Sequence, residues 1–562
     1  MIGLTDSPII ETNCGQVRGR TYYFDDTRHS VSAFLGIPYA KPPIGSLRFK
    51  KPQPTDSWFQ IRNCNSFGGC CPFIEPGRRG VFASNYSIRR LLVFECFCAS
   101  QSRQCDNKLC IIFKNTVKSN LPVLFYIHGG GYVIGNSAQC GDLRICKYLC
   151  SKDLIVVTIN YRLGLFGFFT TGDSKAPGNY GLWYFQIALY NLPKQFRDQT
   201  LALKWVKDNI ERFGGNPTQV TVSGHSAGAA SADLLSISPH SRDLFQNVAL
   251  IGGSSFCNWA MTRTQSTLRK AFKLAQKRGF RSKNSNNEEL LNFLQRLPAS
   301  ELKIAAHGIP VIGDEDIIAM HLAPVIDGDF FPKMLDELRK EAPKRNVLAG
   351  IAEYEGLIAF VLHIKFLATN RAKDSLEEKA KMFIRTYVKS RNDAERIQQI
   401  FNKMTSAEGD YEKQCIQIMS DLFISFGLYE SAQSYMQRGG NVFLYTFEHI
   451  RPGVSGLLEN FLPFLGASHG TEIAYLFGTL SHSDFQPNKH DELVIDRFAS
   501  YFANFSRTGD PSTRSQPWLP ISTNRPFQHM IIQSNSDEQE DNFCDKRPLT
   551  WQKLFENNRS KL

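Results

Sequence analysis

The chain has 562 residues, of which 42% are hydrophobic and 12% aromatic, so it can bury a large core and is not a disordered protein. Its formal net charge is +12, but the basic residues are scattered without interleaved aromatic residues, which favours a solvated basic surface over a nucleic-acid site. No apolar run reaches the length that a membrane-spanning helix needs.

The cysteines and the two chain ends bear on cofactors and location. The 14 cysteines show no zinc-site spacing, so we expect no metal and no cofactor. The segment Met1–Asp6 lacks the charged and apolar regions of a signal peptide, so we expect none. The last residues, Ser560-Lys561-Leu562, form a peroxisomal address, which predicts a location in the peroxisome or the cytoplasm and an import receptor as a partner.

Strands and helices alternate in the first half of the chain. Apolar and β-branched runs predict strands, at residues 10–19, 31–34, 122–127, 154–160 and 220–222. A proline-rich stretch at 37–43 is a rigid loop, and an amphipathic helix over 200–213 ends at Gly214-Gly215-Asn216-Pro217. The alternation indicates an α/β fold, with a large, mostly parallel central sheet and helices on both faces.

The second half of the chain is mostly helical. Helices are predicted at 288–297 and 376–387, a strand at 441–447 and a polar surface stretch at 538–545. No internal repeat is visible. We therefore expect a single domain over residues 9–555, followed by a tail of residues 556–562.

One serine has the setting of a nucleophile. The segment Gly224-His225-Ser226-Ala227-Gly228 follows the strand at 220–222 and leads into a predicted helix over 229–235. The two glycines let the chain turn sharply, so the hydroxyl of Ser226 is exposed at the carboxyl edge of the sheet. The free N–H groups of the new helix then point at whatever Ser226 attacks.

A nucleophilic serine also needs a base, a group that orients the base, and donors for the developing oxyanion. The segment His128-Gly129-Gly130-Gly131 follows the apolar strand at 122–127, and consecutive glycines let the backbone turn its N–H groups into one cavity. We assign the oxyanion donors to Gly130 and Gly131, with the N–H of Ala227 as the third.

Further distinctive segments run along nearly the whole chain. They are Phe34–Pro43, Leu47-Arg48-Phe49, His128–Gly131, Asn160–Gly164, Gly178–Leu182, Asp198–Val206, Phe213–Pro217 and Pro324–Gly328. Together they resemble the type-B carboxylesterases, in the cholinesterase-like family of α/β-hydrolases. The resemblance implies the α/β-hydrolase fold and a small-molecule ester as the substrate.

The resemblance also implies the other two members of a catalytic triad. In this family an acid in a Glu-Gly pair follows an apolar strand; Glu355 matches that position, and Glu353 is its competitor. His469 matches the family's His-Gly-x-Glu pattern and would be the general base and then the general acid. Glu355 would orient this histidine and stabilise its imidazolium form.

Two departures from the family pattern lie close to Ser226 in the sequence. Relatives usually carry glutamate before the nucleophile, whereas this chain has His225, from which we expect a changed substrate preference. Residues 184–197 interrupt a segment that relatives have in one piece. They are either a surface loop or translated intron, and if they are real, the pairing of Arg162 with Asp198 that the family suggests is in question.

A third departure covers residues 74–104, which resemble nothing firmly. Cys71 and Cys105 look like the ends of the family's first disulfide loop, which implies a disulfide between them. No tryptophan lies between these two cysteines, so a cation–π site for choline is unsupported. Cys257 matches one end of the second family disulfide, but residues 278–281, where its partner is expected, contain no cysteine.

The acyl pocket can be predicted only in part. The family's size-limiting residues correspond to Met320 and Leu322, which are aliphatic and flexible, with His225 at the pocket floor. This implies short to medium acyl chains on an apolar alcohol.

We therefore predict a serine carboxylic ester hydrolase that works through an acyl-enzyme. Three alternatives stay open: a cholinesterase-like enzyme, a non-catalytic adhesion protein of the same family, and a member impaired by residues 184–197. The complete set of Ser226, Glu355 and His469 disfavours the adhesion protein.

Overall fold

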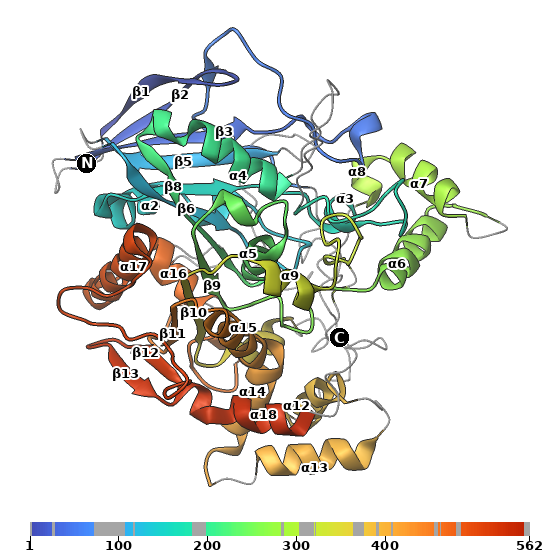
Figure 1. The fold of residues 1–562 in the computed structure, drawn as a ribbon, viewed down its shortest axis with the longest axis vertical. Helices are drawn as coiled ribbons and strands as arrows, with labels where there is room; N and C mark the ends of the chain where they lie inside the picture. Colours follow the sequence, from blue (N-terminus) through green and yellow to red (C-terminus); the bar gives the residue numbers. More distant parts are fainter. Residues whose placement is uncertain are drawn as a thin grey trace.

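A large sheet runs through the molecule and is covered by helices on both faces (Figure 1). The computed structural model of the chain describes residues 3–24, 29–71, 107–115, 119–182, 198–282, 286–302, 320, 322–362, 376–388, 393–405, 408–454, 459–460, 462–478 and 485–555. The sheet and its two helical layers confirm the predicted α/β class.

The sheet of the described residues has thirteen strands, in the order β1-β2-β3-β5-β7-β6-β8-β9-β10-β11-β12-β13, with β4 paired to β2. The strands from β7 to β12 in this order pair in parallel. The strands of the path on either side pair antiparallel, and the short β4 pairs with β2 in parallel. The strands are β1 Gly3–Thr12, β2 Gly15–Phe24, β3 His29–Pro38, β4 Arg62–Asn63, β5 Lys108–Lys114, β6 Leu121–Ile127, β7 Ile155–Ile159, β8 Gly215–His225, β9 Asn247–Ile251, β10 Val347–Ala352, β11 Val442–Phe447, β12 Gln528–Ile532 and β13 Glu538–Asp541.

The parallel strands are buried on both faces, and the side chains of β6 show how. Val123, Phe125 and Ile127 belong to one hydrophobic core, and the alternate residues Leu124 and Tyr126 belong to a second core on the other face. Helices α4, α5 and α15 contribute to the first core, and α2, α16 and α17 to the second.

The α-helices of the described residues are α2 Leu143–Tyr148, α3 Gly164–Phe168, α4 Asp198–Asn209, α5 Ala227–Ile237, α6 Thr264–Lys277, α7 Asn287–Arg296, α8 Ala299–Leu302, α9 Leu335–Glu341, α10 Ile358–Leu362, α12 Leu376–Arg385, α13 Ala394–Met404, α14 Tyr411–Ser420, α15 Phe426–Gln437, α16 Thr471–Phe477, α17 Lys489–Thr508 and α18 Arg547–Phe555. Among them, none combines the length and the apolar character needed to cross a bilayer.

The prediction of one strand over residues 10–19 is wrong, because the chain reverses direction there. β1 and β2 form an antiparallel hairpin. Thr12 closes its turn: the hydroxyl donates to the carbonyl of Gly15 and accepts the N–H of Cys14 at 3.2 Å. Asn13 and Gly15 were turn signals inside an otherwise strand-like segment.

The other predicted elements are present with shifted ends. The helix predicted over 200–213 is α4 plus one 3₁₀ turn, and it ends at Gly214, which has φ 80°. Strand β8, which leads to Ser226, is longer than predicted, because it begins at Gly215 and runs through Asn216 and Pro217. The polar stretch at 538–545 contains β13, an edge strand with exposed side chains.

The residues that flank 183–197 are hydrogen-bonded to each other. The N–H of Gln199 donates to the carbonyl of Gly181 at 3.3 Å, and the N–H of Thr200 donates to that of Leu182 at 3.2 Å. Asp198 also accepts the backbone N–H and the Nε of Arg162, both at 2.8 Å, in a fully buried ion pair. The pairing that residues 184–197 put in question is therefore present, whereas residues 74–104 and 184–197 themselves lie outside the described part of the chain.

Candidate active site

Ser226 lies in a strained turn between β8 and α5. It has φ 57° and ψ −122°, a conformation that is costly for any residue except glycine and that the surrounding packing must hold. Its N–H donates to the carbonyl of Ile251, at the end of β9, at 2.8 Å. A side chain at Gly224 would collide with the backbone of Gly228. Ser226 thus stands in the strand–turn–helix setting that the sequence predicts. The predicted exposure of this residue is wrong: Ser226 is buried, with 6% of its surface exposed, because Gly129 and Gly253 lie directly against it.

The glycine loop after β6 lies directly against this turn. A β-carbon at Gly129 would come within 3.1 Å of the β-carbon of Ser226. Gly130 has φ 110°, and a side chain there would collide with the carbonyl of Ile134, so this position requires glycine. The loop is folded back on itself, because the Gly130 carbonyl accepts the N–H groups of Val133 and Ile134 at 3.1 and 3.0 Å.

The three backbone N–H groups predicted to bind an oxyanion have no acceptor in a regular hydrogen bond among the described residues. No described group accepts a hydrogen bond from the N–H of Gly130 or Gly131. Ala227 is the first residue of α5, and the N–H of a first helical residue has no acceptor within its own helix. Backbone donors are therefore available on both sides of Ser226.

Glu355 and His469 form a hydrogen-bonded pair. The Nδ1 of His469 lies 2.7 Å from Oε2 of Glu355, which follows β10 and is fully buried. The second carboxylate oxygen accepts the N–H of Ala352 at 2.9 Å. The two loops are also joined by a backbone bond, in which Tyr354 donates to Ala467 at 2.9 Å. A carboxylate that accepts from Nδ1 leaves the Nε2 of His469 to act as a base.

Glu353, the competing acid, lies elsewhere. Its N–H donates to the carbonyl of Phe447 at 3.1 Å, and burial raises the pKa of its carboxyl group. No hydrogen bond or ion pair joins Glu353 to His469 in the described part of the chain. The histidine therefore has Glu355 as its acid partner.

Two glycines that the sequence analysis did not single out connect the serine to this pair. Gly252 and Gly253 directly follow β9. A β-carbon at Gly252 would lie 3.2 Å from Oε1 of Glu355 and 3.3 Å from Nδ1 of His469, and one at Gly253 would lie 2.7 Å from the carbonyl oxygen of Ser226. Adjacent residues thus contact both halves of the site. A Gly-Gly pair at the end of an apolar strand was the signal that could have identified them.

His225 packs its ring against the ring of His469. The two ring centroids are 4.5 Å apart, with 34° between the ring planes. Burial, and next the neighbouring His469, lower the pKa of His225 well below its usual value, so its imidazole is neutral. The residue before the nucleophile therefore brings no negative charge to the site.

The predicted acyl-pocket residues Met320 and Leu322 are both buried, while residues 303–319 and 321 lie outside the described part. Aromatic rings also pack near the histidine: Phe423 packs edge-on against His469 at 6.0 Å, and Trp259 packs on Phe423 at 5.8 Å. The size limit set by Met320 and Leu322 stays a prediction.

The cysteine predictions are tested only in part. The sulfur of Cys71 accepts the N–H of Leu163 at 3.3 Å, but Cys105 lies outside the described residues, so their disulfide stays a prediction. Cys257 is a free, buried thiol, and burial raises its pKa to about 12. Such a thiol is not a nucleophile at neutral pH.

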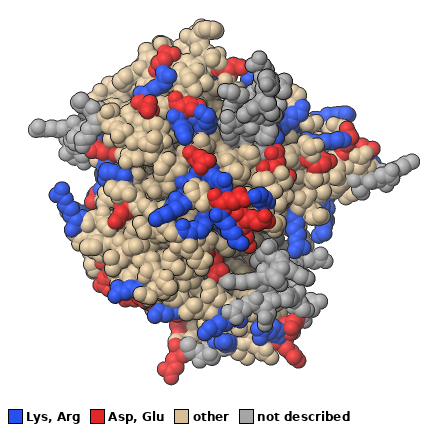
Figure 2. Space-filling view, viewed as in Figure 1, with Lys and Arg blue, Asp and Glu red and all other residues tan. Residues whose placement is uncertain are grey.

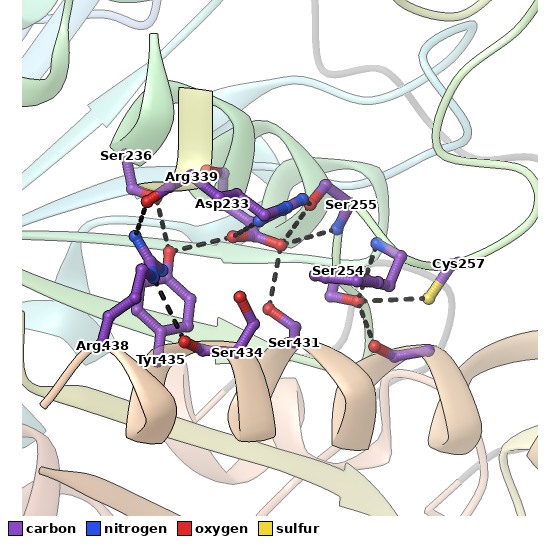
Figure 3. A network of polar contacts seen from close by, with 12 residues as sticks. Asp233, Ser236, Ser254, Ser255, Cys257, Arg339, Ser431, Ser434, Tyr435 and Arg438 are labelled. Atoms are coloured by element: carbon purple, nitrogen blue, oxygen red, sulfur yellow. Dashed lines mark hydrogen bonds and ion pairs between the residues drawn. The ribbon is translucent and has the colours of Figure 1, made fainter. Parts of the chain in front are cut away.

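A buried polar network connects helix α5 to its neighbours (Figure 3). At its centre the carboxylate of Asp233, on α5, is fully buried. Its partners come from three other parts of the chain: Ser255 (N–H at 2.9 Å, and its hydroxyl), Ser431 (3.0 Å), Tyr435 (2.9 Å) and Arg339 (ion pair, 3.5 Å). Burial would raise the pKa of Asp233, but the Arg339 guanidinium and the hydrogen-bond donors lower it below its usual value.

The comparison with known proteins decides the family. Residues 6–551 match the model of the Carboxylesterase family, which is almost the entire chain. The chain belongs to the carboxylesterase family. This family of carboxylic ester hydrolases is the one that the sequence segments resemble.

Individual relatives of this carboxylesterase-family chain cover most of its length. It is 35% identical to Esterase cest-33 of Caenorhabditis elegans, over 96% of the chain and 92% of the relative. It is 30% identical to the acetylcholinesterase of Bungarus fasciatus, over 92% and 81%, and 29% identical to Pyrethroid hydrolase Ces2a of Mus musculus, over 92% and 86%. In the described part of the chain, no three histidine, cysteine or acidic side chains lie together as a metal site would require.

Proposed function

We propose that this chain is a serine carboxylesterase that cleaves small carboxylic esters through an acyl-enzyme on Ser226. The observation that carries the proposal is the 2.7 Å hydrogen bond between His469 and the buried Glu355, joined to the strained turn of Ser226 through Gly252 and Gly253. A buried carboxylate bound to an imidazole next to a serine in a strained turn is the arrangement that activates a hydroxyl nucleophile.

The first half of the proposed reaction transfers the acyl group to the enzyme. The hydroxyl oxygen of Ser226 attacks the ester carbonyl carbon, while Nε2 of His469 takes the hydroxyl proton. The N–H groups of Gly130, Gly131 and Ala227 bind the oxyanion, and donors of this kind are each worth about 3 kcal/mol in the transition state. The tetrahedral intermediate then collapses, and His469 gives the proton to the departing alkoxide.

The second half restores the enzyme. Water attacks the acyl carbon while His469 takes one of its protons, a second tetrahedral intermediate forms, and the proton returns to the Ser226 oxygen as the acid leaves. Glu355 stays ionised throughout and stabilises the imidazolium that forms in each half. The apolar ring of Phe423 beside His469, backed by Trp259, favours an apolar ester.

Hydrolysis of p-nitrophenyl butyrate by the purified chain tests this proposal. The wild type should release p-nitrophenol with a burst of one equivalent per active enzyme before the steady state, and Ser226→Ala should remove both the burst and the turnover. Ser151→Ala, which changes an exposed serine, is the matched control and should keep both. A folded wild type with no turnover would favour the impaired alternative.

A cholinesterase-like activity is the second candidate, because the acetylcholinesterase of Bungarus fasciatus is among the relatives. The neutral His225 argues against it, since a carboxylate at this position would attract a quaternary ammonium group. Butyrylthiocholine should therefore be cleaved no better than a neutral thioester of the same shape. A clear preference for the cationic substrate would support the cholinesterase alternative.

The tripeptide Ser560-Lys561-Leu562 leads us to propose import into peroxisomes. A fluorescent protein fused to the N-terminus should give a pattern that coincides with a peroxisomal marker. Removal of the three residues should make it diffuse, and an unchanged diffuse pattern in both cases would reject the proposal.

A further inference from the structure

A second histidine and a second glutamate lie beside the Glu355–His469 pair. Nε2 of His225 is 4.0 Å from Oε1 of Glu472, which is fully buried at the start of α16. Neither this nitrogen nor either Glu472 carboxylate oxygen has a partner at normal hydrogen-bond geometry among the described residues. Buried polar atoms rarely lack partners, because an unmade hydrogen bond leaves the cost of removing the atom from water uncompensated. Two such groups that face each other at this distance point to an interaction between them.

Among the described residues, no lysine or arginine forms an ion pair with Glu472 that would offset a charge there. Oε1 of Glu355 and Oε1 of Glu472 both face the same point, since a β-carbon at Gly252 would lie 3.2 and 3.3 Å from them. Tyr126 of β6 and Tyr445 of β11 also face this carboxyl group, and burial raises the pKa of each phenol well above its usual value, so both are neutral.

The electrostatics around Glu472 favour its neutral form. Burial, and next the charge of Glu355, raise the pKa of Glu472 well above its usual value. The N–H groups of Gly470 and of Glu472 itself face the carboxyl group and lower its pKa, but to a smaller extent. Two carboxylates side by side in a low dielectric cannot both ionise at low cost, and Glu355 is already bound to His469.

We propose that His225 and Glu472 share one proton, which Glu472 carries and Nε2 of His225 accepts, and that this neutral pair positions His469. The proposal rests on the proposed function, since it assigns His469 as the base. A carboxylic acid donates to an unprotonated imidazole nitrogen, so both unpartnered atoms are satisfied without a net charge. The gap of 4.0 Å closes to hydrogen-bond distance by a shift of about 1 Å in two side chains.

The position of the pair in the chain explains what it does. His225 is one residue before Ser226, and Glu472 is three residues after His469. A hydrogen bond between them therefore joins the nucleophile turn to the start of α16, while the His225 ring packs against the His469 ring at 4.5 Å. His225 also lies against the oxyanion loop, since a β-carbon at Gly129 would be 3.0 Å from its Nδ1. His225 and Glu472 are positioning residues that fix the serine, the base and the oxyanion loop relative to one another.

The kinetics of two variants show whether residue 472 acts as a hydrogen-bond donor or through a negative charge. Glu472→Gln keeps a neutral donor, whereas Glu472→Leu removes it. We expect the leucine variant to lose at least ~10-fold in kcat with little change in KM, and the glutamine variant to stay well above it. A loss in Glu472→Gln as large as in Glu472→Leu would overturn the proposal, because the charge would then be what matters.

A double-mutant cycle tests whether the two residues act together. His225→Leu with Glu472→Leu should cost little more kcat than either change alone, because each already breaks the hydrogen bond. Losses that multiply would show two independent effects and contradict the pairing. All variants are compared by thermal melting and by fluorophosphonate labelling of Ser226, so a wild type that fails to label indicates failure of the proposed function and not of this pair.

Infrared spectroscopy of the intact protein locates the proton without a kinetic readout. At pH 7 the difference spectrum between the wild type and Glu472→Gln should contain the C=O stretch of one protonated carboxylic acid. The subtraction isolates Glu472 from Glu448, a second carboxyl group whose pKa burial raises to about 7. Glu538→Gln, on the exposed strand β13, is the matched control and should remove only a carboxylate band. A carboxylate band alone in the Glu472→Gln difference would overturn the proposal.

Discussion

Ser226 is held in its strained conformation by neighbours that leave no room for a side chain. The closest is Gly253, where a β-carbon would lie 2.7 Å from the carbonyl oxygen of Ser226. The Ser226 backbone must therefore shift in Gly253→Ala, and a displacement of about 1 Å at a reacting group costs about 100-fold in rate. We expect a loss of this size in kcat/KM for p-nitrophenyl butyrate.

The matched control is Gly3→Ala, because a β-carbon there meets only ordinary contacts with Tyr23, 3.5 Å or more away. Circular dichroism of both variants separates a local shift from unfolding. Full activity in a folded Gly253→Ala protein would show that the Ser226 turn tolerates displacement.

His128, at the start of the glycine loop, makes the stability of the fold depend on pH. Burial lowers its pKa from 6.5 to about 4, and its ring stacks on Tyr161 at 4.5 Å. In the unfolded chain the His128 imidazole is protonated below about pH 6.5, whereas in the folded chain it stays neutral down to about pH 4. The free energy of unfolding therefore falls as pH decreases from 6.5 to 4. The shift corresponds to about 3 kcal/mol at most.

Urea denaturation at pH 7 and pH 4.5 measures this contribution. His128→Asn should reduce the loss of stability between the two pH values, whereas His490→Asn, which changes an exposed histidine, should leave the loss as in the wild type. An equal loss in wild type and His128→Asn would contradict a buried neutral His128.

At the scale of single residues, the sequence could identify the groups with a distinctive local pattern. Ser226 lies in a strand–turn–helix motif, and the Gly-rich loop follows an apolar strand. The resemblance favoured Glu355 over Glu353, and the structure adds the contact that the sequence cannot show, which is the hydrogen bond between His469 and Glu355. Gly253 was missed because its contact with Ser226 comes from a different strand.

At the scale of elements, helix α5 is fixed by the Asp233 network as well as by apolar packing. Asp233→Asn keeps the shape of the side chain but leaves the buried Arg339 without its charge partner. Removal of one partner of a buried ion pair costs about 3 to 5 kcal/mol. We expect a loss of this size in the free energy of unfolding, measured by urea denaturation.

Asp243→Asn is the matched control for this change, because Asp243 is exposed. It should alter the free energy of unfolding by about 0.5 kcal/mol or less, as surface substitutions usually do. Equal stability of the wild type and Asp233→Asn would mean that the Arg339 ion pair contributes nothing to the position of α5.

The hydrogen bonds that flank residues 184–197 have the pattern of an interrupted helix. If those fourteen positions are left out of the count, Gln199 donates to Gly181 and Thr200 to Leu182 across four residues, as in an α-helix. Deletion of 184–197 should therefore extend α4 by its first turn. It also shortens the chain between two segments that are held together, which lowers the entropy cost of joining them.

Thermal melting and esterase assays of the deletion variant test this expectation. The variant should fold with a melting temperature at or above that of the wild type and keep its activity. A deletion of equal length in α17, residues 490–503, is the control and should abolish folding, because that helix packs on the sheet. An unfolded 184–197 deletion would show that the segment is required.

The elements that could be predicted were those with a regular spacing of apolar residues and a residue that marks their end. The 3₁₀ turn that continues α4 ends at Gly214 as predicted, and β11 begins one residue after its predicted start. The β1–β2 hairpin was missed because strand-like residues flank a short turn. The antiparallel ends of the sheet could not be derived from the order of elements, since pairing is set by contacts between distant segments.

At the scale of the whole molecule, charges of both signs are mixed on the face that Figure 2 presents. Lys and Arg side chains are interspersed there with Asp and Glu side chains. Several of them pair, such as Lys333 with Glu341 and Lys204 with Asp208. The two apolar cores and the buried strands between them agree with the sequence composition, and the site lies where β8, β9 and β10 end.

The most direct test of the account is covalent labelling of the intact protein with a fluorophosphonate, followed by mass spectrometry of its peptides. Such a probe reacts with an activated serine and traps it as a phosphonyl ester. We predict one equivalent of label, located on Ser226 and absent after Ser226→Ala or after heat denaturation. Label on another residue, or no label on a folded protein, would contradict the assignment of Ser226 as the nucleophile of this carboxylesterase-family chain.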